Sequence, residues 1–458
     1  MPVVPLLLAL AQAVGPAPAR MVQVRGGAES SLSAALLNAA PGDTVRVGAG
    51  RHAGTFVIDR AIVLLGEPGA ILDGERKGTV VTVRADSVVV AGFTIKGSGR
   101  SLDRDEAAIR LDRCTGCRVS DNRITDPLHG IYLLESRGVT LARNEITGAA
   151  DLPESLRGNG IHLFSSRDNR IEGNRIRRTR DGIYFSFAGE NHVLDNDVAE
   201  VRYGLHYMYS DGNAFDRNSF ARNAAGAAIM FSKRIAFRDN RFVHHVGYRA
   251  YGILLQTTEQ VVAERNRIEG NLTGLFLDGA VGNTFRDNVI SGNGIGIDVL
   301  ASAEGNVFAR NIVTHNRVAV RKVLGNGENA WDDGRAGNYW HDPSIFDLDG
   351  DGIGDRPYRV GDAYATLAAT RPALELFSAT LAARALSWAE EAFPVFETPR
   401  VEDRMPLVRQ PDADARTDAS AADPGRMARA AALLLLAVVF SAGSGGPLRK
   451  RLARRESR

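Results

Sequence analysis

The chain has only two cysteines among its 458 residues, and they lie together as Cys114-Thr-Gly-Cys117. Two thiolates do not complete a zinc site, which needs four ligands. A thioredoxin-like redox motif would need a βαβ setting, which the surrounding sequence does not show. The pair is therefore expected to form a turn with a small local disulfide, or to remain a loose pair of thiols.

The chain also lacks an excess of charge of one sign, with 56 Lys and Arg against 54 Asp and Glu and a net charge of +2. No basic stripe runs through its body, so no nucleic-acid partner is expected. A hydrophobic content of 44% excludes a disordered chain. The 48 glycines and the many asparagines favour tight turns and short strands over long helices.

The N-terminal end predicts export. Residues 1–19 contain an apolar stretch and then Ala17-Pro18-Ala19, which fits a signal peptide. No Lys or Arg precedes the apolar stretch, so a disordered apolar tail is the alternative.

The C-terminal end predicts a membrane anchor. Residues 430–448 carry no charge, and a helix of that length, rising about 1.5 Å per residue, nearly crosses a hydrocarbon core of about 30 Å. The basic tail at 449–458 would remain in the cytoplasm and leave the body outside it. An interfacial amphipathic segment is the alternative to a single anchor.

A repeat of about 22 residues fills the middle of the chain. It is marked by an asparagine two residues before an aliphatic or aromatic residue, at Asn122, Asn144, Asn174, Asn196, Asn218, Asn240, Asn266, Asn288 and Asn311. A glycine precedes most of these asparagines by fourteen residues, at Gly130, Gly160, Gly182, Gly204, Gly226, Gly252 and Gly274. A second asparagine lies five residues before several of them, at Asn169, Asn191, Asn213, Asn283 and Asn306.

This spacing predicts an all-β fold, a right-handed parallel β-helix of the pectate-lyase type over residues 24–323. Each coil has three short strands and stacks about 4.8 Å from the next. Asparagine suits the turns because it tolerates left-handed backbone angles, and its amide can bond the equivalent amide of the next coil. A short helical pattern at Leu32–Ala40 predicts a cap over the open end.

Each strand that follows the recurring glycine has two faces. Its first and third positions are apolar in nearly every coil, as at Leu205 and Tyr207, and are expected to fill the core. The second and fourth positions then point outward, and over several coils they are aromatic or apolar. They predict a partner-docking face of Tyr132, His162, Phe164, Tyr184, Leu254 and Phe276.

The same outward face carries His206, Met208 and Met230, the two methionines on adjacent coils in one column. Thioether and imidazole are soft and borderline ligands that suit Cu(I). A four-residue insertion brings His244 and His245, expected over this face, so these five residues are the copper candidates. Docking of a protein partner and packing under a loop remain the alternatives.

Residues 324–360 form a closing segment with an Asp-rich loop. Asp347, Asp349, Asp351 and Asp355 alternate with glycines, and the Ile353 carbonyl lies among them. Oxygen ligands at such spacing suit Ca²⁺, which we expect to fasten the solenoid end; a metal-free turn is the alternative. Beyond it, residues 361–395 predict a helical extension and residues 396–429 a linker.

The rung "GLHYMYS" and the closure "GNYW…DLDGDGIGD.PY", together with the coils over about Val24–Phe393, resemble the NosD-type maturation proteins of nitrous oxide reductase. The resemblance implies a periplasmic β-helix of denitrification that is not an enzyme. It implies work with the ATPase and membrane subunits of an ABC transporter. With a lipoprotein copper chaperone, these would supply copper to the copper–sulfur centre of nitrous oxide reductase. Copper would then be transient cargo.

The rival class is a polysaccharide lyase, hydrolase or epimerase, which would act on the outer face of such a solenoid. Asp278 and Asp298, on neighbouring coils, would be its carboxylate pair. The rungs between Tyr132 and Gln256 show no acidic cluster, which disfavours this class. A plain adhesin-like scaffold is a third alternative.

Overall fold

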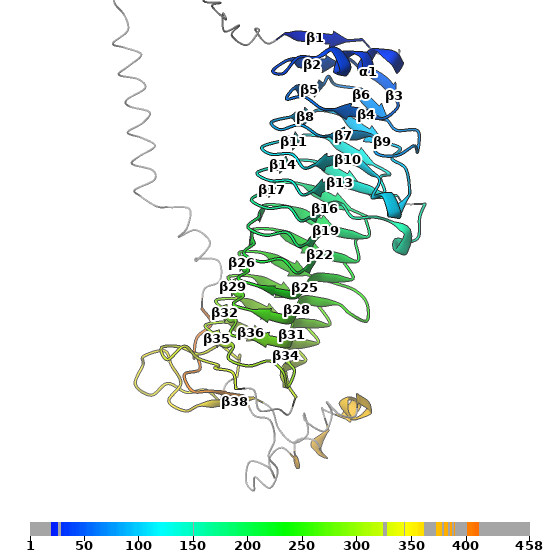
Figure 1. Ribbon diagram of the computed structural model, residues 1–458. Helices are drawn as coiled ribbons and strands as arrows, with labels where there is room; N and C mark the ends of the chain where they lie inside the picture. Colours follow the sequence, from blue (N-terminus) through cyan, green and yellow to red (C-terminus); the bar gives the residue numbers. More distant parts are fainter. Residues whose placement is uncertain are drawn as a thin grey trace, which may run out of the picture. The chain divides into compact units, whose positions relative to one another are not determined.

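A computed structural model describes residues 20–25, 29–149, 151–323, 328–342, 344–360 and 401–411, with short pieces between 372 and 389 (Figure 1). The predicted signal peptide at 1–19, the anchor at 430–448 and the basic tail at 449–458 lie outside the described residues. So does most of the helical extension at 361–395, of which η3 (Pro372–Phe377) is described. None of the described helices is long and apolar enough to cross a membrane.

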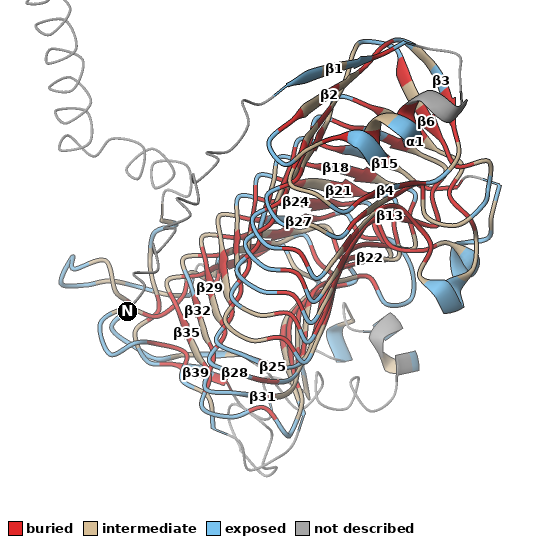
Figure 2. Cartoon of the chain, turned by 45° about the horizontal axis from the view of Figure 1, so that its top comes forward, coloured by how far each residue is buried: buried red, intermediate tan, exposed pale blue. Residues whose placement is uncertain are grey.

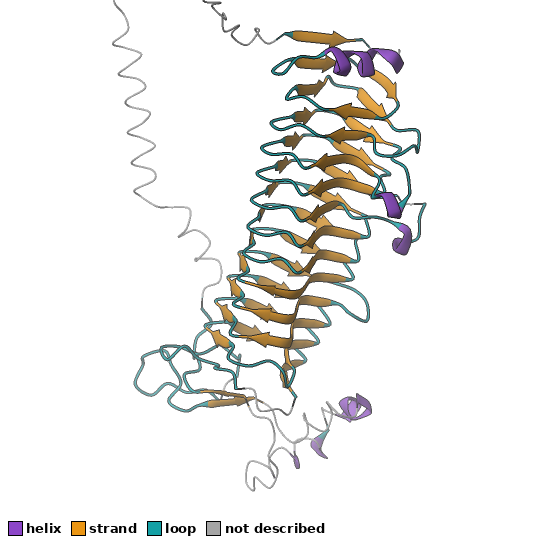
Figure 3. Cartoon of the chain, in the orientation of Figure 1, coloured by secondary structure: helices purple, strands orange, loops and turns teal. Residues whose placement is uncertain are grey.

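The fold is a right-handed parallel β-helix, as the repeat predicts. Each coil contributes one strand to each of three parallel sheets (Figure 3). Sheet A contains β1 (Met21–Val24), β2 (Thr44–Val47), β5 (Val63–Gly66), β8 (Val89–Ala91), β11 (Arg118–Ser120), β14 (Thr140–Ala142), β17 (Arg170–Glu172), β20 (His192–Leu194), β23 (Ala214–Asp216), β26 (Ala236–Arg238), β29 (Val262–Glu264), β32 (Thr284–Arg286) and β35 (Val307–Ala309).

Sheet B follows sheet A along each regular coil. It contains β3 (Gly50–Ala53), β6 (Ala70–Asp73), β9 (Thr94–Lys96), β12 (Arg123–Thr125), β15 (Glu145–Thr147), β18 (Arg175–Arg177), β21 (Asp197–Ala199), β24 (Ser219–Ala221), β27 (Arg241–Val243), β30 (Arg267–Glu269), β33 (Val289–Ser291) and β36 (Ile312–Thr314).

Sheet C has the longest strands and includes the rung "GLHYMYS". It contains β4 (Phe56–Ile58), β7 (Val81–Val83), β10 (Ala107–Asp112), β13 (His129–Leu134), β16 (Ile161–Phe164), β19 (Asp181–Ser186), β22 (Tyr203–Met208), β25 (Ala225–Lys233), β28 (Tyr251–Glu259), β31 (Thr273–Val281), β34 (Ile295–Val299) and β37 (Val318–Lys322). Two short 3-10 helices, η1 (Leu102–Arg104) and η2 (Glu154–Leu156), lie in the loops that precede β10 and β16.

The interior is apolar and layered. Leu205 and Tyr207 are fully buried, which confirms the predicted inward face of β22. Buried residues recur along the strands of the stacked coils (Figure 2). Like side chains stack between coils, as in Phe215 on Phe237 and Phe285 on Phe308, with ring centroids 5.0 and 4.8 Å apart. The first coils are capped by α1 (Glu29–Asn38), where the sequence predicts a helix, and Leu32 and Leu36 of α1 are buried.

A buried asparagine ladder follows the turn between sheets A and B. From Asn122 to Asn338, each side-chain NH2 group donates to the side-chain oxygen of the asparagine in the next coil, at 2.8–3.0 Å. The same oxygen also accepts a backbone N–H of the preceding coil, as from Asn196 to Asn218. The ladder therefore satisfies polar groups that would be costly to bury unpaired.

The ladder ends on Asp403, which lies in the range that the sequence assigns to a linker. Residues 401–408 instead pack on the last coil, where β39 (Val401–Asp403) pairs antiparallel with β38 (Tyr358–Val360). The fully buried Asp403 carboxylate accepts the Asn338 backbone N–H at 2.6 Å and the Trp340 Nε1–H at 2.8 Å. The linker prediction is wrong for this segment because the last rung of the ladder needs an acceptor.

The recurring glycines are explained by close packing of the backbone. A Cβ on Gly204 would lie 2.7 Å from the Gly226 carbonyl oxygen, and one on Gly226 would lie 2.3 Å from that of Gly252. Real Cβ atoms essentially never approach an oxygen so closely. The coils from β13 to β34 therefore need glycine at the entry to the sheet C strand.

Candidate functional site

The outward side of sheet C is the candidate site, and two columns of side chains cross it. In the first column, Tyr184 pairs in register with His206, and His206 with Ala228. In the second column, Ser186 pairs with Met208, and Met208 with Met230. His206, Met208 and Met230 are half-buried, so they are neither core residues nor fully solvated.

Aromatic and imidazole rings alternate down the first column. Ring centroids lie 4.4 Å apart for Tyr132 and His162, 4.5 Å for His162 and Tyr184, and 4.7 Å for Tyr184 and His206. Tyr184 is half-buried, as are Phe164, Leu254 and Phe276 of the predicted docking face. Tyr132 is only 3% exposed, so it cannot contact a partner as the docking prediction requires.

His206 belongs to a buried charge cluster. Its Nδ1 lies 2.9 Å from Asp181 Oδ2, and Arg202 donates to both oxygens of the same carboxylate at 2.8 and 2.7 Å. Asp181 is 1% exposed. Burial raises the pKa of the Asp181 carboxyl, but the hydrogen bonds from His206 and Arg202 outweigh it and hold that pKa below its usual value. The carboxylate is therefore ionised.

Two further imidazoles, His129 of β13 and His162 of β16, lie in sheet C. His129 Nδ1 accepts the Asn159 backbone N–H at 3.0 Å, and burial, then the charges of Arg180 and Arg110, lower the pKa of His129 to about 4. His162 has its Nδ1 3.3 Å from the Asn159 side-chain amide, while its Nε2 is enclosed without a hydrogen-bond partner. Burial lowers the pKa of His162 well below its ordinary value.

The structure does not bring the insertion histidines to the methionines. His245 occupies a position in another ladder, which continues through Asn271, Asn293 and Asn316. Its Nδ1 accepts the Asn223 backbone N–H at 3.2 Å, and its own backbone N–H donates to the Asn271 side-chain oxygen at 3.1 Å. Burial then lowers the pKa of His245 to about 3. The copper prediction is wrong for His245, because the side chain fills the place of an asparagine. His244 is exposed in the turn after β27, against Gly270.

A ridge of exposed aromatic rings borders the second column. Phe187, Tyr209 and Phe231, here called the aromatic ridge, are 57%, 48% and 40% exposed. Their rings stack with centroids 5.3 and 5.1 Å apart. All three adopt positive φ, between 49° and 53°, a conformation that is unusual for bulky residues.

The sequence analysis missed the aromatic ridge because strict alternation assigns the position after Met208 or Met230 to the interior. The left-handed turn breaks that alternation and directs the rings outward. The 22-residue spacing of the three aromatic residues was the available signal.

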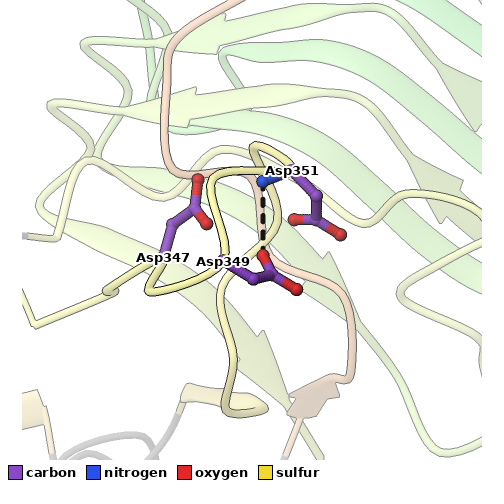
Figure 4. Close-up of side chains that lie close together, drawn as sticks. All are labelled: Asp347, Asp349 and Asp351. Atoms are coloured by element: carbon purple, nitrogen blue, oxygen red, sulfur yellow. Dashed lines mark hydrogen bonds between the residues drawn. The ribbon is translucent and has the colours of Figure 1, made fainter.

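The Asp-rich loop brings three of its predicted ligands together. The carboxylates of Asp347, Asp349 and Asp351 each offer an oxygen within 4.8 Å of the others (Figure 4). Asp349 accepts the Asp351 backbone N–H, and Asp351 accepts that of Ile353, at 3.2 and 2.7 Å. Asp355 instead accepts the Leu348 N–H at 2.6 Å. The loop is thus folded by its own carboxylates, and calcium binding stays a prediction.

The acidic residues of the rival enzyme class do not form a free pair. Asp298 is fully buried and accepts two hydrogen bonds from Arg321. Asp278 accepts the Ser302 hydroxyl at 3.0 Å. One carboxylate is neutralised, so the two do not offer the acid and base that glycoside chemistry needs.

The two cysteines are buried, free thiols in the turn between β10 and β11. Cys117 Sγ lies 3.2 Å from the Ala85 carbonyl oxygen. The neighbouring Cys117, followed by burial, raises the pKa of the Cys114 thiol. Of the two predicted states, the structure shows the pair of thiols.

These features define a class, a parallel β-helix in which the outward side of one sheet carries a histidine and two methionines. The Dettilon tailspike protein shares the fold, with a TM-score of 0.52 at 16% identity over 72% of this chain and 68% of the tailspike chain. At this identity the likeness shows the fold alone.

Sequence comparison then identifies the family. The family model described as "Periplasmic copper-binding protein (NosD)" matches residues 142–345. A relative named "Probable ABC transporter binding protein NosD", from Pseudomonas aeruginosa, is 39% identical over 383 residues, which cover 80% of this chain and 89% of the relative. Its namesake from Stutzerimonas stutzeri is 36% identical over 382 residues, covering 80% and 87%. The chain belongs to the NosD family.

Proposed function

We propose that this chain is a periplasmic, membrane-associated assembly factor that binds copper transiently on sheet C and passes it between partner proteins. The family description as periplasmic and copper-binding supports the compartment and the cargo. On this proposal the chain acts by binding and not by catalysis, and its product is a copper-loaded partner.

The observation that carries the proposal is the pairing of Met208 with Met230. The two residues are direct register partners on adjacent coils, so their backbones lie about 4.8 Å apart. Both side chains are half-buried on the face that also presents His206. Two thioethers and an imidazole are a donor set that fits Cu(I), the soft form of copper. These three residues would hold the cargo.

The surface beside the methionines supports a docking role. The aromatic ridge follows directly after Ser186, Met208 and Met230, so a partner seated on the ridge would lie against the candidate copper donors. Exposed aromatic residues are the side chains that contribute most to protein interfaces. Both relatives are named as ABC transporter binding proteins.

We infer that the partners are the ATPase and membrane subunits of such a transporter and a lipoprotein copper chaperone. The destination of the copper would be the copper–sulfur centre of nitrous oxide reductase. Ca²⁺ in the Asp347–Asp355 loop would fasten the closure on which this end of the solenoid depends.

The test is a titration of the purified protein with Cu(I) under reducing conditions, against a chromogenic Cu(I) chelator. We expect one equivalent to bind, and the double variant Met208→Ala, Met230→Ala to lose it. Met21→Ala is the matched control, because Met21 is an exposed methionine in β1. Equal binding by the double variant and the control would contradict the proposed site. Depolymerisation of an acidic polysaccharide that is lost on Asp278→Asn would favour the enzyme instead.

A further inference from the structure

The Asp181 carboxylate lies 2.9 Å from an imidazole nitrogen of His206 on the candidate copper face. We infer that Asp181 is a positioning residue for copper binding: it holds the His206 proton on Nδ1 and leaves the Nε2 lone pair free for the metal. This inference rests on the proposed function and names a residue that the sequence analysis did not select.

The geometry of the pair supports the assignment. A neutral imidazole carries one proton, and an ionised carboxylate can only accept a hydrogen bond. Because Asp181 Oδ2 lies 2.9 Å from His206 Nδ1, the proton lies on Nδ1. Histidines that bind metals commonly donate their other ring N–H to a carboxylate in this way, which fixes the tautomer and raises the basicity of the ligand.

Arg202 and two aromatic rings hold the pair in place. Arg202 binds the carboxylate through two nitrogens, so Asp181 has little freedom to rotate away from His206. The ring centroids of Tyr184 and Tyr203 lie 4.7 and 5.0 Å from that of His206. Arg202 in turn lies over the Tyr203 ring at 4.6 Å. His206 is thus oriented before any metal arrives.

The neighbouring histidines have the opposite arrangement. His129 and His245 each use Nδ1 to accept a backbone N–H, so the proton of the neutral ring is on Nε2. A protonated Nε2 cannot bind a metal. The Nε2 atom of His162 is buried, whereas the His206 side chain is 13% exposed. Among these four residues, His206 alone combines access with a free lone pair.

The experiment compares Asp181→Asn with Arg202→Gln in the full chain labelled with ¹⁵N-histidine. Ring-nitrogen shifts at about pH 8, where an ordinary histidine is neutral, should report a proton on Nδ1 of His206 in the wild type and in Arg202→Gln. In Asp181→Asn the amide can donate to Nδ1, and the proton should move to Nε2. Cu(I) affinity should then fall by roughly 10- to 100-fold in Asp181→Asn, and by less in Arg202→Gln.

Two controls separate this inference from a loss of fold and from failure of the proposed function. Asp216→Asn removes the carboxylate of another His–Asp pair, with His192 on sheet A, and should leave Cu(I) binding unchanged. Thermal unfolding of each variant reports on folding. A wild type that binds no Cu(I) refutes the proposed function, whatever the tautomer. A wild type that binds Cu(I), with an Nε2 proton on His206 or with full affinity in Asp181→Asn, overturns the inference alone.

Discussion

The turn between sheets A and B and the outer face of sheet C arise from the same repeat but are built differently. The turn has asparagine in successive coils, and each amide is satisfied by the next. The face has a different side chain in nearly every coil, from Tyr184 to His206 to Ala228. A ladder position is fixed by its two neighbours, whereas a face position is free to vary. The ladder therefore stabilises the fold, and the face is where we propose that copper binds.

Breaking the ladder should have the largest effect on stability. Asn218→Leu would remove the acceptor of the Asn196 backbone N–H and of one Asn196 amide hydrogen bond. It would also remove the amide hydrogen bonds that Asn218 donates to the Val193 carbonyl and the Asn240 side-chain oxygen. We expect a loss of about 3–5 kcal/mol in the free energy of unfolding, because each buried unpaired group costs roughly 1–3 kcal/mol. The midpoint of urea unfolding, followed by tryptophan fluorescence, measures this loss of stability.

Arg217→Ala is the matched control for the ladder variant, because Arg217 directly precedes Asn218 in the chain. The substitution removes only an exposed ion pair between Arg217 and Asp195. It should cost less than about 1 kcal/mol. Similar losses in the two variants would show that the ladder does not dominate stability.

Acid should be the next largest perturbation, because His129 and His245 are buried imidazoles whose Nδ1 accepts a backbone N–H. Their folded pKa values are lowered, to about 4 and about 3, by burial first. As the pH falls below about 6.5, the unfolded chain therefore binds protons before the folded one does. The contribution of the two histidines to the free energy of unfolding is therefore fully present above about pH 6.5 and is lost as the pH falls toward about 4. His129 accounts for on the order of 3 kcal/mol of it.

Urea midpoints measured from neutral pH to about pH 4 test the acid effect. His129→Asn keeps an acceptor for the Asn159 N–H but does not titrate, so its stability should fall less steeply with acid. The same pH dependence in the variant and the wild type would contradict the assignment.

Changing the aromatic ridge should affect stability least. Tyr209→Asn replaces an exposed ring at φ 49° with a residue that tolerates this conformation. We expect a change within about 0.5 kcal/mol in unfolding, together with weaker association with transporter subunits in a pull-down from membranes. A loss of stability like that of Asn218→Leu would place the ridge with the fold and not with docking.

Much of this structure follows from local patterns in the sequence. The asparagine spacing predicts the coils, and the alternation of apolar residues predicts that Leu205 and Tyr207 are inside and Met208 is outside. Both patterns depend only on residues one strand or one coil apart. Alternation failed at Tyr209, where a positive φ turns the next side chain outward.

The sequence did not predict which polar groups form hydrogen bonds with each histidine. His206 and His245 are chemically equal in the chain, yet one donates to Asp181 and the other accepts from Asn223. Asp181 is 25 residues from His206, and nothing in the repeat singles it out among the acidic residues. The donor or acceptor state of an imidazole depends on which polar group the fold places beside it.

By itself, the sequence determined the solenoid, its ladders and the pairing of Met208 with Met230, because a fixed repeat length brings equivalent residues into register. Only the tertiary structure decided that Asp403 ends the ladder, that three rings form an exposed ridge, and that Asp181 sets the proton of His206. Asp403 lies 65 residues from Asn338 in the chain, and Asp181 contacts His206 across coils. The ridge depends on a positive backbone φ at each of its three residues. Contacts and angles of this kind are set by the three-dimensional packing and not by the repeat spacing.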